Sequence, residues 1–185
     1  PSGKLPTSFP SRIEDTPAYA SYPGKDLQMN YEEKLLVGYR WYESKSIKPL
    51  FCFGHGLSYT GFQYDDLKVM TNEANEVSCR FTVKNTGSMN GSEIAQCYVG
   101  FHDAMDGEPK KTLQGFSKEE ISIGETKNYE IKLTPRNFSY WNVETKTWQI
   151  RKGLYQICIG SSVENVHLEA SVNLEQVLEV HQQLV

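Results

Sequence analysis

The segment VSCRFTVKNTGSMNGSEIAQCYVG, residues 77–100, decides the fold class that this sequence predicts. Its first nine residues, VSCRFTVKN, alternate apolar and polar side chains, which is the period of a strand with one buried face. TGSMNG follows with the composition of a turn, and SEIAQCYVG (92–100) is a second apolar-rich run of strand length. The segment therefore predicts two strands joined by a short turn.

The same pattern continues toward the C-terminus. Further strands are predicted for the runs TLQGFSKEEISI (112–123), ETKNYEIKLT (125–134), FSYWN (138–142), TWQIRKGLYQICIGSS (147–162) and HLEASVNL (167–174). We expect the first run to be interrupted at Gly115 and the second to end at Pro135, because proline cannot donate to a strand ladder. Seven or so short strands separated by turns, with almost no helical period, predict a mainly β protein that contains an antiparallel β-sandwich.

The first 66 residues depart from this pattern. They hold six of the eight prolines and seven of the eleven tyrosines, and they show little periodicity. A free linker would be poor in aromatic residues, so the rings of this largely irregular segment must be buried against the sandwich or against a partner. We therefore predict three parts: residues 1–66, a sandwich over 67–174, and a tail over 175–185 that is either a short amphipathic helix or a frayed end.

The charge distribution excludes some classes of partner. The 185 residues include 23 acidic and 19 basic ones, interspersed, with a net charge of −4. The lack of a basic stripe argues against nucleic-acid binding. No apolar run approaches the roughly 20 residues of a membrane span, and PSGKLPTSFP lacks the hydrophobic core of a signal peptide. We expect neither a nucleic acid nor a membrane as partner.

The four cysteines are Cys52, Cys79, Cys97 and Cys158. They form no CxxC pair and have no histidine at zinc-ligand spacing. Three of them lie inside apolar alternating runs, which favours buried free thiols that behave as small hydrophobic groups; a disulfide between neighbouring strands is the alternative. Unpaired cysteines slightly favour the reducing cytoplasm, while a secreted or periplasmic location stays open.

The run IKPLFCFGHGLSYTGF (47–62) crowds rings, glycines, a histidine and a cysteine together. Cys52 and His55 are three residues apart and could share a metal, but Gly54 and Gly56 indicate a tight turn instead. The sequence contains no Gly-x-Ser-x-Gly elbow, P-loop or dinucleotide fingerprint. We therefore expect no metal and no cofactor.

That run belongs to YEEKLLVGYRWYESKSIKPLFCFGHGLSYTGFQYDDLKV (31–69), which resembles the segment between the second and third domains of glycoside hydrolase family 3 enzymes, the β-glucosidases, β-xylosidases and their relatives. The positions that match the family pattern are Tyr31, Glu33, Val37, Gly38, Tyr39, Arg40, Tyr42, Phe53, Gly54, Gly56, Leu57, Ser58, Tyr59, Thr60 and Phe62. Upstream, GKLPTSFP (3–10) is similar to the end of the family's α/β sandwich domain. Downstream, the strands are similar to its fibronectin type III-like domain, which has an immunoglobulin-like sandwich fold.

Three residues depart from the family pattern. Lys34 stands where the family usually has glycine, Glu43 where it usually has aspartate, and Cys52 where it usually has proline. Because lysine adopts a left-handed conformation less easily than glycine, Lys34 puts the family geometry of its loop in question. We expect the other two changes to be tolerated.

The resemblance also implies where catalysis takes place. Family members hydrolyse β-glycosides with retention by means of two carboxyl groups about 5–5.5 Å apart. One lies on an N-terminal (β/α)₈ barrel and the other on the α/β sandwich domain, so the resemblance implies no catalytic residue in this chain. The chain would be the C-terminal structural portion of a β-glycosidase, specifically a β-glucosidase acting on terminal non-reducing β-D-glycosyl residues. It would pack on the catalytic domains in cis, or in trans if the enzyme is split.

Three residues near the expected domain junction are candidates for contact with the β-linked oligosaccharide substrate. Glu33 lies among aromatic residues, and Arg40 stands between two rings, where it could stack or bind a carboxylate bidentately. Trp41, with Trp141 and Trp148, could form a platform for sugar stacking. The structural alternatives are a hydrogen-bonded carboxylate for Glu33, an ion pair for Arg40, and packing for the tryptophans.

Two other functions remain as alternatives. The tryptophans are also compatible with a stand-alone carbohydrate-binding sandwich. The aromatic segment 1–66 is also compatible with a protein-interaction module that docks on a separate catalytic chain.

Overall fold

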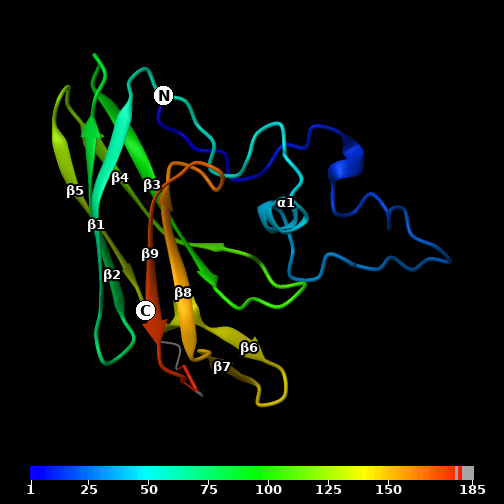
Figure 1. Ribbon diagram of the computed structural model, residues 1–185. Coiled ribbons are helices and arrows are strands. Elements are labelled where there is room, and N and C mark those ends of the chain that lie inside the picture. The colour runs from blue at the N-terminus through cyan, green and yellow to red at the C-terminus, as the bar shows by residue number, and fades with distance from the viewer. Residues whose placement is uncertain (178, 181–185) are drawn as a thin grey trace.

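Two antiparallel β-sheets pack face to face in the computed structural model, which describes residues 1–177, 179 and 180 (Figure 1). The smaller sheet has the order β1-β2-β5, the larger has the order β4-β3-β8-β9, and β6 and β7 form a separate hairpin. The strands are β1 Phe62–Thr71, β2 Val77–Asn85, β3 Gly91–Phe101, β4 Thr112–Ile121, β5 Thr126–Leu133, β6 Tyr140–Asn142, β7 Thr147–Gln149, β8 Gly153–Gly160 and β9 Val166–Leu174. The helices are η1 Ile13–Asp15, α1 Tyr39–Lys45 and η2 Pro135–Phe138. The predicted antiparallel β-sandwich is confirmed.

Residues 77–100 form β2 and β3, as predicted, and these two strands belong to different sheets. The turn between them is fixed by Asn85, which is fully buried at the end of β2. Its side-chain amide donates to the carbonyls of Met89 at 2.8 Å and Ile121 at 3.0 Å, and its side-chain oxygen accepts from the backbone N–H of Gly87. The turn therefore carries the chain from one layer of the sandwich to the other.

The main core lies between the two sheets. The alternating residues of β2, namely Val77, Cys79, Phe81 and Val83, are all buried there. Phe81 stacks between two rings, with centroids 6.2 Å from Tyr64 and 5.3 Å from Tyr129. All four cysteines are buried free thiols, in line with the interpretation of these residues as core side chains.

Strand β1 was not predicted from the sequence. A bulge between Asp65 and Lys68 shifts its register against β2, and Asp66 adopts a left-handed φ of 59°. Phe62 and Tyr64 therefore face the core on one side of the bulge, and Leu67 on the other, so the alternation changes phase within the strand. The domain boundary expected between residues 66 and 67 falls at this bulge and stays a prediction.

The interruption expected at Gly115 is a bulge within a continuous strand β4. Cys97 of β3 pairs with Gly115 and Tyr98 pairs with Leu113, so Gln114 is left between them. A Cβ atom at Gly115 would lie 2.7 Å from a methyl carbon of Ile131 in the facing sheet, which explains the glycine. The bulge turns Gln114 out of the regular ladder.

The described part of the C-terminal tail is extended. Val177 forms a β-bridge with Ile150, and the backbone N–H of Val180 donates to the carbonyl of Trp148 at 2.7 Å. The helical alternative for the tail is therefore wrong for residues 175–177, 179 and 180, because Val177 and Val180 form backbone hydrogen bonds with Ile150 and Trp148 instead. Residues 178 and 181–185 of the predicted tail lie outside the described residues.

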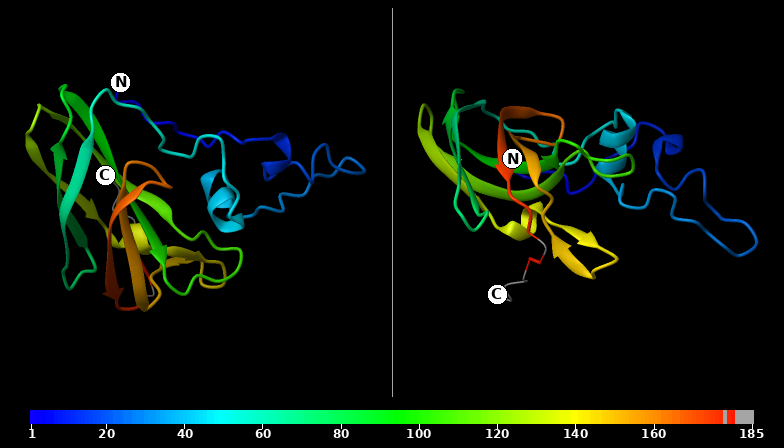
Figure 2. Two further views of the ribbon diagram at one scale, coloured as in Figure 1. Left: turned by 45° about the horizontal axis from the view of Figure 1, so that its top comes forward. Right: turned by 60° about the horizontal axis from the view of Figure 1, so that its bottom comes forward.

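Residues 1–61, which we call the strap, run along the outer face of the larger sheet and then stand out to one side of the sandwich (Figure 2). Residues near the N-terminus pair with the run around Phe51: Leu5 and His55 share a backbone hydrogen bond of 2.8 Å, and Phe9 forms an antiparallel bridge with Phe51. The strap contains one α-helix, α1. In the part of the chain that the structure describes, no helix has the length and apolar character needed to cross a membrane.

Candidate functional site

Helix α1 fastens the strap to the sandwich. Tyr39 stacks on Phe53 with ring centroids 4.5 Å apart and meets Tyr98 of β3 edge-on at 6.2 Å. The Tyr39 hydroxyl accepts a hydrogen bond of 2.8 Å from the backbone N–H of Leu113 in β4. These rings cover a second, smaller core formed by Cys52, Tyr98, Cys158 and Val163 on the outer face of the sheet.

An ion pair flanks this small core. Lys111 lies 3.2 Å from a carboxylate oxygen of Glu43, and each side chain is about four-fifths buried. The Lys111 ammonium also lies 5.9 Å from the centroid of the Tyr98 ring. Glu43, which departs from the family's aspartate, therefore has a defined partner, and this contact is consistent with the expectation that the change is tolerated.

The run 47–62 contains a tight turn at residues 52–55, closed by a hydrogen bond from the His55 N–H to the Cys52 carbonyl, and this turn is fixed to β3. Gly54 adopts a left-handed φ of 80°, and a Cβ atom there would collide with the side-chain amide of Gln96. That buried amide donates to the carbonyls of Gly54 at 3.1 Å and Ser161 at 2.8 Å, and its oxygen accepts from the Tyr98 hydroxyl. His55 packs on Phe51 with ring centroids 5.2 Å apart. These contacts give the turn a structural role.

A second attachment joins the N-terminus to the sandwich. Lys4 lies 3.2 Å from a carboxylate oxygen of Glu93, which is buried in β3. The Tyr64 hydroxyl donates to the same oxygen at 2.7 Å, and His167 stacks on the Tyr64 ring at 4.2 Å. Burial is the main cause that lowers the pKa of His167 and raises the pKa of Tyr64. Sequence reasoning missed this cluster, because Lys4 and Glu93 are 89 residues apart in the chain.

The strap leaves much of its apolar surface uncovered. Its large apolar side chains that are more than half exposed are Ile13, Tyr22, Leu27, Tyr31, Leu35, Val37, Leu50, Leu57 and Tyr59. Single exposed apolar residues are ordinary on a protein surface, whereas a dense set of them marks an interaction surface. Among the rings of this segment, Tyr39 and Phe53 pack against the sandwich. Tyr22, Tyr31 and Tyr59 are exposed, so burial of these three rings against a partner stays a prediction.

The structure places the three predicted substrate contacts in or beside α1. Trp41 donates its indole N–H to the carbonyl of Asp15 at 3.1 Å, which is a packing role. The Nε of Arg40 and the hydroxyl of Ser44 are buried without a hydrogen-bond partner in the described residues. Glu33 lies in the preceding turn, where its carbonyl accepts from Leu36 at 2.8 Å. Contact of Glu33, Arg40 or Trp41 with substrate stays a prediction.

The three tryptophans do not form one platform. Trp141 and Trp148 face each other across the hairpin β6-β7, with centroids 5.3 Å apart. The guanidinium of Arg136 lies 2.9 Å from the centroid of Trp148 and covers it. Trp41 lies on α1, away from this hairpin (Figure 1).

The backbone conformation of Lys34, which stands where the family usually has glycine, is left-handed. Lys34 adopts a left-handed φ of 49°, which glycine would adopt at no steric cost. The lysine therefore adopts a conformation that the glycine usual in the family allows most easily. The left-handed conformation of Lys34 carries an energetic cost, because in this conformation the Cβ atom of any residue other than glycine is crowded against the backbone.

Comparison with known proteins identifies the sandwich. The profile of the fibronectin type III-like domain family matches residues 93–163, from β3 to just after β8. The sandwich is a fibronectin type III-like domain. The strap, β1, β2 and β9 lie outside the matched range, so the profile by itself says nothing of them.

Longer matches come from individual proteins. "Thermostable beta-glucosidase B" of Acetivibrio thermocellus is 39% identical over 183 residues, which are 97% of this chain and 24% of that protein. "Beta-glucosidase BoGH3A" of Bacteroides ovatus is 36% identical, over 90% of this chain and 23% of that protein. The chain therefore spans about a quarter of the length of the curated relatives it matches.

Solved structures agree with these matches. The GH3 β-glucosidase of Bifidobacterium adolescentis superposes with a TM-score of 0.90 at 32% identity, over 100% of this chain and 28% of that one. DesR, a β-glucosidase of Streptomyces venezuelae solved with D-glucose, superposes with a TM-score of 0.87 at 36% identity, over 95% of this chain and 23% of that one. The strap and the fibronectin type III-like domain together thus correspond to a C-terminal part of GH3 β-glucosidases.

Proposed function

We propose that this chain is the non-catalytic C-terminal portion of a retaining β-glucosidase that hydrolyses terminal non-reducing β-D-glucosyl residues. The observation that carries the proposal is the strap, which is fixed to the fibronectin type III-like domain and leaves nine large apolar side chains more than half exposed. The relatives are about four times as long as this chain, so they contain the domains that such a surface could contact.

The partners we propose are the catalytic barrel and the α/β sandwich domain of the same enzyme, in cis or in trans. The exposed side chains Leu57 and Tyr59 would pack on them, since an apolar surface is stabilised when it is removed from water. In this arrangement the domain junction and linker span residues 1–66, the sandwich 67–174 and the tail 175–185.

The chemistry in this proposal belongs to the partner domains. Retaining hydrolysis needs one carboxylate as nucleophile and one carboxyl group as acid and base, about 5–5.5 Å apart. The most buried carboxylates that the structure describes in this chain are paired with cations: Glu93 with Lys4, and Asp15 with Arg12. The chain would orient and stabilise the catalytic domains and leave the reaction to them.

An assay on an aryl β-D-glucoside tests the proposal. The chain alone should give no turnover above a protein-free blank, whereas co-expression with the catalytic domains of its native protein should yield a stable, active complex. Turnover by the pure chain would overturn the proposal, as would catalytic domains that are equally active and equally stable without the chain.

Matched variants test the docking surface. Leu57→Asp and Tyr59→Asp place a charge on side chains that are 72% and 77% exposed in the chain, so they should leave its own folding intact and weaken assembly at least about tenfold, as expected for apolar residues in an interface core. Met89→Asp, at an exposed site in the turn between β2 and β3, is the control. Equal assembly of all three variants would exclude this surface as the docking site.

A further inference from the structure

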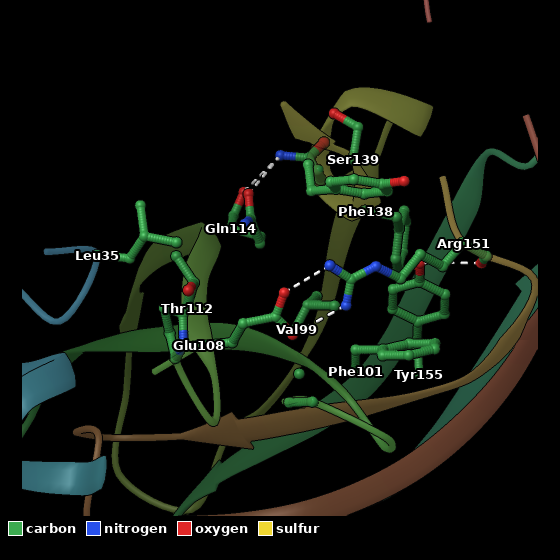
Figure 3. A pocket seen from close by; sticks show the side chains of 15 residues that line it. Leu35, Val99, Phe101, Glu108, Thr112, Gln114, Phe138, Ser139, Arg151 and Tyr155 are labelled. Carbon is green, nitrogen blue, oxygen red and sulfur yellow. Dashed lines mark hydrogen bonds and ion pairs between the residues drawn. The ribbon is translucent and has the colours of Figure 1, made fainter. Parts of the chain in front are cut away.

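A hollow of about 170 Å³ lies at the end of the sandwich between the loop after β3, η2 and the residue Arg151 that precedes β8 (Figure 3). Its apolar wall is formed by Val99, Phe101, Phe138 and Tyr155, and Leu35 of the strap borders it on the opposite side. No sequence pattern pointed to this hollow, and of its lining only Leu35 belongs to the exposed apolar set that supports the docking role.

One side of the hollow carries an ion pair. Arg151 donates to both carboxylate oxygens of Glu108, with the Nη1 to Oε2 distance at 2.8 Å. The guanidinium is held between two rings, 4.4 Å from the centroid of Tyr140 and 5.6 Å from that of Phe101. The guanidinium holds the pKa of Glu108 below its ordinary value. The two charges cancel, so this side of the hollow presents carboxylate acceptors without a net charge.

The other side carries neutral polar groups. Asn137 donates its side-chain amide to the side-chain oxygen of Gln114 at 3.1 Å and to the Gln114 carbonyl at 3.3 Å. Gln114 is the bulged residue of β4, so its side chain is turned out of the ladder toward η2. Neither the Gln114 amide N–H₂ nor the Thr112 hydroxyl has a hydrogen-bond partner of its own within the described residues, and both line the hollow. They offer donors opposite the carboxylate acceptors.

This combination of groups fits a sugar ring. A neutral pyranose presents hydroxyls that both donate and accept around its edge, and C–H groups on its faces that pack on apolar walls. A charged ligand would have to compete with the Arg151–Glu108 pair, which is costly to break when it is partly buried. The volume lies below the roughly 300–1,000 Å³ of sites for drug-sized ligands, which favours one ring over a longer chain.

We propose that this hollow is a non-catalytic subsite for a single neutral pyranose, either a free hexose or the terminal ring of a β-linked oligosaccharide. Glu108 accepts from its hydroxyls, Gln114 and Thr112 donate to it, and Phe138 packs against its C–H groups. The subsite goes beyond the docking role: the groups that would hold the ring lie in the fibronectin type III-like domain, and the subsite needs no partner domain.

Nuclear magnetic resonance of the ¹⁵N-labelled 185-residue chain tests the subsite, because the side-chain amides of Gln114 and Asn137 give their own signals. D-glucose and cellobiose are titrated as probes, and D-glucuronate serves as a charged ring of similar shape. We expect saturable shifts of the two amide signals with glucose, cellobiose or both at millimolar sugar, and much smaller shifts with glucuronate. The sugar that binds more tightly identifies the source of the ring.

Two outcomes would overturn the subsite: amide signals that do not move up to the solubility limit of both neutral sugars, or an equal response to glucuronate. Thr112→Val and Gln114→Leu each remove one hydrogen-bonding group and should weaken binding by about three- to tenfold. Thr126→Val, the same change at an exposed site of β5, should leave binding unchanged. None of these readouts depends on glucosidase activity or on assembly, so failure of the subsite and failure of the docking role can be told apart.

Discussion

The core between the two sheets and the contact between strap and sandwich are held together in different ways. The core is continuous and apolar, with alternating side chains from β2 and β5 buried against those of β3 and β8. Each such side chain contributes about 1.5–3 kcal/mol relative to an exposed one. The strap contact rests on the small cluster around Tyr98, on two ion pairs and on a few backbone hydrogen bonds.

This difference implies two levels of stability within one chain. Segments with few buried apolar contacts open at a lower free energy than the core unfolds, so the strap should detach before the sandwich melts. Hydrogen exchange separates the two events: the amides of Leu5 and Gly54 report on the strap, and those of Cys79 and Val83 report on the core. A partner bound to the exposed apolar residues of the strap would reduce the difference between the opening free energy of the strap and the unfolding free energy of the core, because binding stabilises the docked state by mass action.

The largest effect is expected from Phe81→Ala, which removes the central ring of the stack with Tyr64 and Tyr129. Phe81 is 2% exposed, so the variant leaves a cavity and should lose about 3–5 kcal/mol of unfolding free energy. Urea unfolding followed by circular dichroism measures the loss. The control Phe116→Ala, at a β4 residue that is 68% exposed, should unfold as the parent does. A loss below about 1 kcal/mol for Phe81→Ala, close to the accuracy of such measurements, would contradict this assignment of the core.

A smaller and more local effect is expected from Lys4→Met. The variant leaves the Glu93 carboxylate buried with only the Tyr64 hydroxyl as partner, which should cost about 2 kcal/mol of strap docking. Exchange at Leu5 should accelerate, while exchange at Cys79 in the core should not. Lys152→Met removes a solvent-exposed ion pair with Glu175 and should change neither amide, as is usual for surface pairs. Equal acceleration at both amides would show that strap and sandwich unfold as one unit.

The regularity of each segment decides how much of the fold could be predicted from the sequence. Strands with unbroken alternation, such as β2 and β5, were predicted with bounds that differ by no more than one residue. Strand β1 was missed because the bulge at Asp65 and Asp66 changes the phase of its alternation. Helix α1 was missed because its seven residues make only about two turns, too short a run to show a helical period.

The sites were harder to predict than the fold. The turn role of Gly54 was predicted from its backbone freedom and agrees with its left-handed φ of 80°. Gly56 has no positive φ and is explained instead by the close approach of the Gly3 carbonyl. The family resemblance pointed to the strap. The pairs Lys4–Glu93 and Glu108–Arg151 join residues 89 and 43 positions apart. No local pattern encodes such pairs, because they form only when the chain has folded and each charge has lost its water.

A gain in stability is expected from Lys34→Gly. The left-handed φ of 49° crowds the Cβ atom of Lys34 against its own backbone, at about 1–2 kcal/mol. Glycine removes this strain but gains freedom in the unfolded chain, so the net stabilisation of the strap should be about 0.5–1 kcal/mol. Slower exchange at the Leu36 amide, which is hydrogen-bonded to Glu33 in this turn, reports the gain. Lys48→Gly, at an exposed position with a negative φ, should give no gain; a similar gain there would mean that strain is not the cause.

The smallest effect concerns pH and the attachment beside Glu93. Burial lowers the pKa of His167 from its ordinary 6.5, and Lys4 acts in the same direction while Glu93 opposes it. His167 therefore binds a proton more readily in the unfolded chain than in the folded chain. The free energy of unfolding should thus fall as pH drops through about 6.5 toward the lower pKa of His167 in the folded chain. His167→Phe keeps a ring against Tyr64 but cannot titrate. Exchange at Leu5 should lose part of its pH dependence in this variant between about pH 7 and about pH 5.5, after correction for intrinsic exchange. An unchanged pH dependence would mean that His167 does not couple to the strap, and the attachment would then rest on the Lys4–Glu93 pair alone.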